Sequence, residues 1–422
     1  MTWLDRVLPA WTAPNDRTYL LVGVILIVLS RVLVIALTPR MADLADLRIY
    51  QSAGQAVLAG VNPYDFADQP NVREELRLAV AATDGEGSFA ATSDSWNYYV
   101  SGNLPVSTAS YAAFEYLSQG SRTVWRLLFI IGDVAMFLAM LSLFRVVRGA
   151  PLDAACRIAA VCLVVINPSL ILSGTVIPED KQFQTAFMLW AAALLLSPAP
   201  TGFVRGMAGG FIVSLSVLCK FFGAFLLPIW LNRAFKEPAK FAVSTVVGAL
   251  IPIAASFLAF GTHFLLTMSG RAVRDSVEGP EHASPWVLFP WLTGHWYFTV
   301  KVLAVVAVCA FLAALTWRRR IDLLNCCAGL TVTFACVWLD KGAMNRMDIA
   351  IIFAVAATAS LGPTLLVALS AITLLAAVAG YAVGLGLLHA ALQQVDAVLV
   401  LLFLFAYVIG LSLQSPLRVA RA

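Results

Sequence analysis

Long apolar segments separated by short polar connections make up most of the chain from residue 19 onward. A hydrocarbon layer of roughly 30 Å takes about 20 apolar residues per helical crossing, and helices satisfy their own backbone polar groups inside it. We therefore predict an all-α polytopic membrane protein. The predicted spans are 19–38, 124–146, 156–176, 182–198, 206–220, 222–232, 240–262, 297–316, 321–339, 348–361, 363–387 and 395–414.

One pair of these segments leaves two topologies open. Segment 222–232 is too short to cross a bilayer alone. With 206–220 it forms either one long bent helix or a re-entrant pair hinged at Lys220 and Gly223. The whole chain, 1–422, is then a single membrane domain with about 11 or 12 crossings.

Composition agrees with this class, because 60% of the residues are hydrophobic, 12% are charged and the mean hydropathy is +0.85. The formal net charge of +4 does not indicate nucleic-acid binding, since most basic residues flank apolar segments. These flanking residues are Arg145, Arg148, Arg157, Arg205, Arg233, Lys236, Lys240, Arg318, Arg319, Arg320, Arg418 and Arg421.

Orientation follows from these short basic connections, which favour the cytoplasm. They share one side if both termini are cytoplasmic and the first span is a retained signal anchor in a bacterial-type inner or plasma membrane. The opposite, extracytoplasmic side then receives 39–123, 174–181, 263–296, 340–347 and 388–394.

Two charged residues fall inside predicted spans. Arg31 and Asp133 lie at nearly the same depth from the extracytoplasmic ends of the first two spans. Charges in lipid are costly unless they are paired or hydrated. We predict that the two side chains face each other or share a polar cavity.

The first extracytoplasmic loop, 39–123, is the largest region without a span, and it contains two carboxylates beside a predicted interfacial helix. From Asp46 onward, Leu47, Tyr50, Gly54 and Leu58 share one face, while Arg48, Gln51 and Gln55 face elsewhere. Asp43 and Asp46 either cap the helix start or supply a general base just above the bilayer.

Basic residues also occur on the extracytoplasmic side, against the charge bias. Arg271, Arg274, Lys341, Arg346 and Lys181 either contact lipid headgroups and nearby acids or bind a lipid-linked phosphate. The carboxylates Glu179 and Asp180 either belong to a solvated turn or orient a hydroxyl acceptor.

Metal and disulfide chemistry receive no support from the sequence. The seven cysteines lie in or beside apolar spans, where small packing residues are typical, and the four histidines do not form a ligand set. We expect no cofactor and no metal ligands, and the residues leave a metal requirement open.

The string Asp46-Leu-Arg-Ile-Tyr50, followed by Ala53, Gly60 and Pro63-Tyr64, resembles the first loop of glycosyltransferases with the GT-C fold. The resemblance is to polyprenyl-phosphate-mannose-dependent enzymes of glycosyltransferase family 87, and also to the first mannosyltransferase of GPI-anchor synthesis. Further matches in the first 240 residues are Tyr98-Tyr99, Pro105, Asn167-Pro168, Lys220 and Pro228. The acidic pair here is Asp43-Leu-Ala-Asp46 where the family has Asp-x-Asp, and the segment 71–94 lengthens the loop.

The resemblance implies a GT-C-like bundle in which Asp46 is the catalytic base. The donor would be a polyprenyl-phosphate sugar, by preference mannose, and the acceptor a lipid-linked or glycan hydroxyl on the extracytoplasmic face. A single displacement would invert the anomeric configuration through an oxocarbenium-like transition state. The expected acceptor-orienting residues are Asp43, Glu179 and Asp180, and the expected phosphate-binding residues are Lys220, Arg271, Arg274, Lys341, Arg346, His282 and His295.

Two other classes stay open at this point. A transporter or flippase for lipid-linked saccharides predicts inverted repeats and charges near the bilayer midplane. A polysaccharide polymerase or ligase using lipid-pyrophosphate substrates predicts essential Arg and His residues in a large late loop, whereas 263–296 is modest in length.

Overall fold

The structure is a computed structural model of the whole chain. It describes residues 14–38, 45–60, 62–64, 104–149, 151–176, 180–197, 203–236, 240–262, 264–265, 285–289, 291, 294–338, 344–382 and 392–414. Within these ranges every regular element is helical.

The first half of the described chain carries the elements that position the candidate site. They are α2 (Pro14–Leu37), α3 (Ala45–Leu58), α7 (Pro105–Ser118), α8 (Arg122–Arg148), α9 (Ala154–Ala160), the π-helix η4 (Val161–Val165), α10 (Pro168–Thr175), α11 (Lys181–Leu196), α12 (Phe203–Cys219), the 3-10 helix η5 (Phe221–Leu226), α13 (Leu227–Lys236) and α14 (Lys240–Phe260).

The second half consists of upright apolar helices joined by short breaks. They are η6 (Pro285–Leu288), α16 (Gly294–Trp317), α17 (Leu323–Thr333), η7 (Phe334–Trp338), α18 (Met344–Ala357), η8 (Thr358–Ser360), α19 (Pro363–Ala382) and α20 (Leu392–Ser412).

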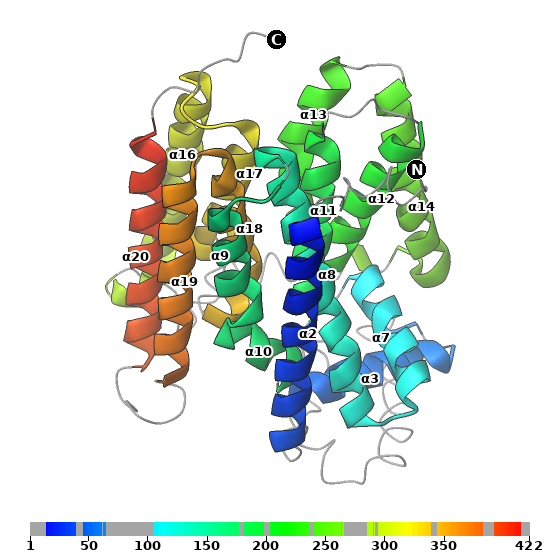
Figure 1. Cartoon of the computed structure of the whole chain (residues 1–422). Helices are drawn as coiled ribbons and strands as arrows, with labels where there is room; N and C mark the ends of the chain where they lie inside the picture. The colour runs from blue at the N-terminus through cyan, green and yellow to red at the C-terminus, as the bar shows by residue number, and fades with distance from the viewer. Residues whose placement is uncertain are drawn as a thin grey trace.

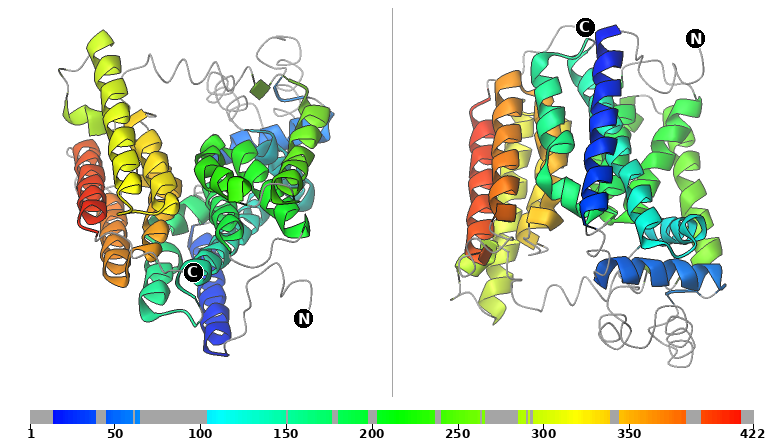
Figure 2. Two further views of the ribbon diagram at one scale, coloured as in Figure 1. Left: turned by 90° about the horizontal axis from the view of Figure 1, so that it is seen from above. Right: turned by 60° about the horizontal axis from the view of Figure 1, so that its bottom comes forward.

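Most helices stand side by side, with α16 to α20 on one side of the bundle and α11 to α14 on the other (Figure 1). Helices α2, α8, α9 and α10 lie between these two groups. Helix α3 departs from this direction, because it lies across the lower end of the bundle next to α7 (Figure 2). The lower end therefore carries a helix of the orientation expected for an interfacial segment.

Every predicted apolar segment coincides with a helix or with consecutive helical turns in the part of it that the structure describes. By length and composition, four described helices are able to cross a membrane: Asn15–Leu37, Arg122–Arg148, Phe241–Phe260 and Trp296–Trp317. The pair Ala154–Val165 and Pro168–Thr175, bent by 41°, makes a fifth if it is one span. The predicted count of about 11 or 12 is higher, because the fully described stretches of the other apolar helices count only 10–17 residues. The protein is α-helical with the long apolar helices of a membrane protein.

Helices α12 and α13 form a hairpin whose turn is at Lys220, which rules out the predicted alternative of one long bent helix. Lys220 is extended (φ −157°, ψ 123°) and separates α12 from η5. A Cβ on Gly223 would lie 2.7 Å from Cβ of Ser216, so η5 folds back directly onto α12. At the other end, Arg233 donates to the carbonyls of Leu195 and Ser197, close to where α12 begins.

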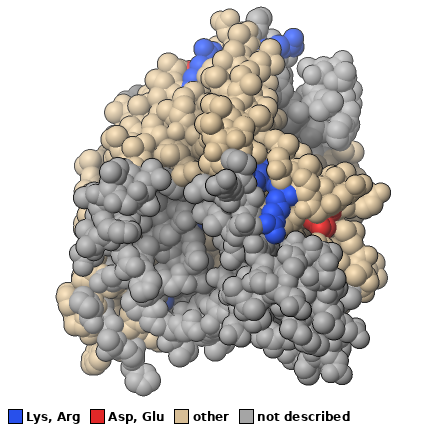
Figure 3. Space-filling model, turned by 90° about the horizontal axis from the view of Figure 1, so that it is seen from below, with Lys and Arg blue, Asp and Glu red and all other residues tan. Residues whose placement is uncertain are grey.

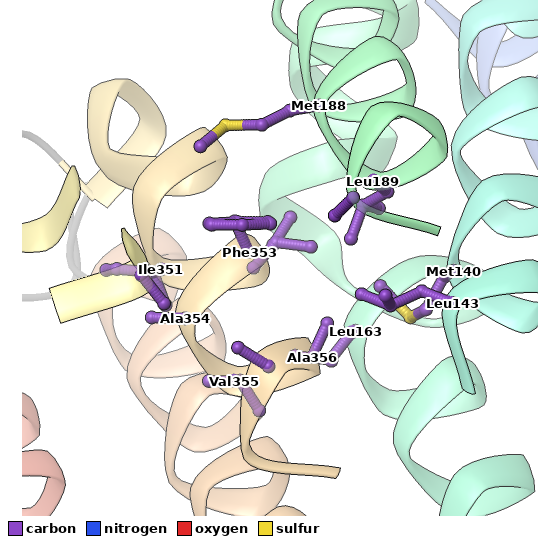
Figure 4. Packing of buried hydrophobic residues seen from close by; sticks show 14 of the residues in the cluster. Met140, Leu143, Leu163, Met188, Leu189, Ile351, Phe353, Ala354, Val355 and Ala356 are labelled. Atoms are coloured by element: carbon purple, nitrogen blue, oxygen red, sulfur yellow. The ribbon is translucent and has the colours of Figure 1, made fainter. Parts of the chain in front are cut away.

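The apolar core joins the two groups of helices through their central members. Met188 and Leu189 of α11 face Phe353 of α18, with Leu163 of η4 and Met140 of α8 beside them (Figure 4). These side chains are fully buried. Close packing between α8, α11 and α18 gives the lower ends of these helices a rigid support.

The predicted contact between Arg31 and Asp133 is confirmed. Arg31 Nε lies 3.1 Å from Asp133 Oδ2, and both side chains are fully buried. The guanidinium also donates to the carbonyls of Val165 (2.6 Å) and Val164 (2.7 Å). Pro168 has no N–H to offer to the carbonyl four residues earlier, so the break between η4 and α10 leaves acceptors that Arg31 satisfies.

Candidate functional site

Helix α3 begins at Ala45, so Asp46 lies in its first turn, as predicted. The side chain of Asp46 lies outside the described part of the structure. The predicted apolar face is right for Leu47, Tyr50 and Gly54, which are buried. It is wrong for Leu58, which is 51% exposed, and for Gln51, which is 5% exposed and donates to the Gly120 carbonyl at 3.4 Å.

These two differences have one cause, the packing of α3 on α7. A Cβ on Gly54 would lie 2.5 Å from the Tyr111 carbonyl oxygen, so the two backbones are in direct contact there. Tyr50 and Tyr111 stack with their ring centroids 4.5 Å apart. Gln55 donates to Glu115 at 2.8 Å, and this carboxylate also accepts from the Trp125 indole at 2.7 Å. The packing of α7 on α3 therefore covers Gln51, whereas Leu58 stays exposed.

Next to this helix pair, Asp180 and Lys220 form an ion pair that the local sequence around neither residue identifies. Lys220 Nζ lies 3.3 Å from Asp180 Oδ1, with the Asp180 side chain 5% exposed and the Lys220 side chain 28% exposed. Ser107 Oγ of α7 donates to Asp180 Oδ2 at 2.5 Å. Asp180 thus connects the start of α11, the start of α7 and the turn of the α12–α13 hairpin.

Local sequence explains the position of each partner. Asp180 precedes the first residue of α11, where a helix start favours a carboxylate. Pro105 at the first turn of α7 fixes that helix start two residues before Ser107. Lys220 lies at the hairpin turn, where its extended backbone ends α12 before η5 begins.

The electrostatics of Asp180 favour the ionised carboxylate. Burial raises the pKa of Asp180, but the Lys220 ammonium and the hydrogen bond from Ser107 outweigh burial, so the pKa is lowered below the ordinary 3.8. Near it, the Tyr111 hydroxyl is buried and has no hydrogen-bond partner within the described residues. Burial and the nearby Asp180 charge raise the pKa of Tyr111 well above 10. The site therefore holds an anion, a cation and a neutral phenol.

A chain of contacts connects this ion pair with the helix that carries Asp46. Tyr111 lies beside Asp180 and stacks on Tyr50 of α3. Asp46 precedes Tyr50 by four residues, about one turn of α3. The first turn of α3 and the Asp180–Lys220 pair consequently occupy the same end of the bundle.

Most of the other predicted site residues lie outside the described part. Asp43, Glu179, Arg271, Arg274, His282 and Lys341 are not among the described residues, and His295 and Arg346 lie on α16 and α18 with side chains that are not described. Of the predicted acceptor-orienting and phosphate-binding groups, the structure brings together Asp180 and Lys220.

Metal binding finds no support in the described part of the chain, where no group of three or more His, Cys, Asp or Glu side chains has the geometry to hold an ion.

Seen from below, the described surface at this end is largely uncharged, with a small basic area and an acidic one near it (Figure 3). Among the predicted site residues, the charged side chains that the structure describes here are those of Asp180 and Lys220.

Sequence reasoning missed Ser107 and Tyr111. Both lie on α7, a helix that the sequence analysis left inside the long loop 39–123. A signal was present, because Pro105 is followed by residues 107 and 111 at a spacing of four, which places them on one helical face.

Comparison with protein-family models, with curated proteins and with solved structures gives no match to this chain.

The described groups allow two kinds of chemistry. A partly exposed ammonium is able to contact a phosphate oxygen, since three donors on a flexible stem suit a compact anion. A carboxylate in the first turn of α3 is able to accept a proton if a hydroxyl comes within hydrogen-bond distance.

Proposed function

We propose that the protein is an integral membrane glycosyltransferase of the GT-C type that moves a sugar, by preference mannose, from a polyprenyl-phosphate donor to a hydroxyl of a lipid-linked or glycan acceptor. Asp46 is its general base, and Lys220 contacts the donor phosphate. The reaction takes place on the extracytoplasmic side, with both termini in the cytoplasm.

The observation that carries the proposal is the meeting of three features at one end of an apolar bundle. These are the flat helix α3 with Asp46 in its first turn, the buried Asp180, and the partly exposed Lys220. A polyprenyl carrier stays in the hydrocarbon while its phosphate lies at the interface, so a transferase for it needs charged groups where apolar helices end. The resemblance of the α3 sequence to GT-C enzymes supplies the reaction class.

The proposed reaction is one displacement. The acceptor hydroxyl oxygen forms a bond to the anomeric carbon, the bond from that carbon to the phosphate oxygen breaks, and the hydroxyl proton moves to Asp46. The phosphate leaves on its lipid carrier with an added negative charge, which the Lys220 ammonium stabilises. Asp180 holds Lys220 in place through the ion pair of 3.3 Å.

The test uses purified protein in lipid nanodiscs with radiolabelled polyprenyl-phosphate mannose and a panel of lipid and glycan acceptors. Wild type should transfer the label, and Asp46→Asn should lose about 100-fold or more in rate, the range of general-base catalysis. Asp153→Asn is the matched control, because Asp153 caps α9 at the opposite end of the bundle. Its rate should equal that of wild type.

Two outcomes would contradict the proposal. Normal transfer by Asp46→Asn would remove the assigned base. If wild type consumes no such donor but moves a lipid-linked saccharide between the leaflets of a vesicle, transport replaces transfer as the function.

A further inference from the structure

Arg126 in the first turns of α8 is a buried cation that the proposed reaction does not use. Its side chain is 1% exposed, although it lies at the end of the bundle that carries the candidate site. Among the described residues its hydrogen bonds go to neutral oxygens: the Thr38 carbonyl at 2.9 Å, the Thr38 hydroxyl at 2.6 Å and the Thr175 carbonyl. Burying a charged guanidinium costs free energy of desolvation, and a neutral donor side chain bonded to the same oxygens would cost less.

The two threonines occupy corresponding places in the chain. Thr38 directly follows α2, and Asp46 comes eight residues later. Thr175 ends α10, and Asp180 comes five residues later. Each threonine therefore lies at the end of the helix that precedes a carboxylate of the candidate site.

Only a planar group with several donors joins two such helix ends at once. The guanidinium uses Nη1 and Nη2 on Thr38 and Nε on Thr175, so one rigid plane sets the distance between the two helix ends. A lysine ammonium at this position would carry the same charge but would lack the planar set of donors. The main effect of these hydrogen bonds is therefore to set the distance between Thr38 and Thr175, and not to add to the stability of the fold.

We propose that Arg126 is a positioning residue, which holds the end of α2 and the end of α10, the two helices that precede Asp46 and Asp180 in the sequence, at one separation by joining Thr38 to Thr175. This role rests on the proposed transferase function for its effect on rate. The physical link between α2 and α10 is measurable without any substrate.

The first measurement is therefore a distance. Spin labels are introduced as unnatural amino acids at Leu37, which is 71% exposed at the end of α2, and at the half-buried Leu172 of α10. Unnatural amino acids avoid the native cysteines. Wild type should give one narrow distance distribution and Arg126→Ala a broadened or shifted one, with Arg126→Lys between them. Arg145→Ala is the matched control, because Arg145 is a buried arginine at the other end of α8, bonded to Asp16 at 2.8 Å. It should give the wild-type distribution.

The second measurement is the rate of sugar transfer by the same variants. Misplacement of reacting groups by about 1 Å costs on the order of 100-fold in rate, so kcat of Arg126→Ala should fall about that far while KM for the donor changes little. Arg126→Lys should recover part of the loss, and Arg145→Ala should keep the wild-type kcat. If Arg126→Ala does not fold, both measurements are made on Arg126→Lys and Thr38→Val. Thr38→Val removes the hydroxyl that accepts from Arg126 and donates to the Val34 carbonyl, and it keeps the Thr38 carbonyl acceptor.

Distance distributions that are identical in wild type, Arg126→Ala and Arg126→Lys would overturn the positioning role whatever the rates are. A broadened distribution in Arg126→Ala with an unchanged kcat would overturn it as well, because the link would exist without serving the reaction. Absence of sugar transfer by wild type would instead contradict the proposed function, while the distances would still report on the link.

Discussion

Arg31 of α2 and Asp133 of α8 form a fully buried ion pair of 3.1 Å across 102 residues of sequence. Arg31 also satisfies two backbone carbonyls of η4, so one side chain joins three helices at the depth where lipid offers no hydrogen bonds. The pair is one of the contacts that attach α2, most of whose surface is exposed, to the bundle, together with the ion pair of Asp16 with Arg145 at 2.8 Å.

Asp133→Ala should destabilise the protein by about 3–5 kcal/mol, because it leaves the Arg31 charge buried without its counter-ion. The measurement is the free energy of unfolding in mixed micelles. Asp153→Ala provides the comparison, since its pair with Arg148 is partly exposed and its loss should cost about 1 kcal/mol, mainly as a helix cap. Equal losses for the two variants would mean that the Arg31–Asp133 pair contributes no more than a surface contact.

The apolar helices of this protein were predictable from the lengths of their apolar runs, whereas α7, inside the long loop 39–123, was not. Each predicted span coincides with a helix, and the depths of Arg31 and Asp133 predicted their contact. Hydropathy does not distinguish a straight helix from a hairpin, however. The fold-back of η5 onto α12 depends on the close approach of Gly223 to Ser216, which only tertiary packing reveals.

The candidate site was predictable one residue at a time, but its pairings were not. Asp180 and Lys220 were assigned to different roles, yet the structure pairs them, because the α12–α13 hairpin brings its turn to the start of α11. Ser107 reaches the same carboxylate from α7, 73 residues earlier in the chain. Contacts of this kind depend on which helix ends meet, and no local pattern contains that information.

Ser107→Ala and Tyr111→Phe should have opposite effects on stability. Ser107 donates to an ionised carboxylate, so its loss should cost about 1.5–3 kcal/mol. The Tyr111 hydroxyl is buried without a hydrogen bond in the described part of the site, so its removal should be neutral or stabilising. Thermal unfolding in detergent compares the two variants. A large loss for Tyr111→Phe would show that the phenol does bond to Asp180.

The contribution of Asp180 to stability should depend on pH. Since its folded-state pKa lies below the ordinary 3.8, the ionised carboxylate stabilises the fold above that value and loses this effect as the pH falls through the folded pKa. Asp180→Asn should therefore be less stable than wild type at pH 7, and the difference should shrink below about pH 4. Melting curves of both proteins across this range make the measurement. A difference that stays constant down to the lowest pH would mean that the charge of Asp180 does not stabilise the fold.

Neighbouring glycines in α12 should respond differently to alanine. A Cβ on Gly210 would lie 1.9 Å from the Thr245 carbonyl oxygen of α14, whereas a Cβ on Gly209 would have its nearest neighbour, Leu195 Cδ2, at 4.0 Å. Gly210→Ala must push α14 away, at a cost of about 1–3 kcal/mol, and should displace the hairpin that carries Lys220. Gly209→Ala should be tolerated and should gain about 0.5–1 kcal/mol from the better helix former. Unfolding free energies of both variants test this contrast, and tolerance of alanine at both positions would show that α12 and α14 do not approach so closely.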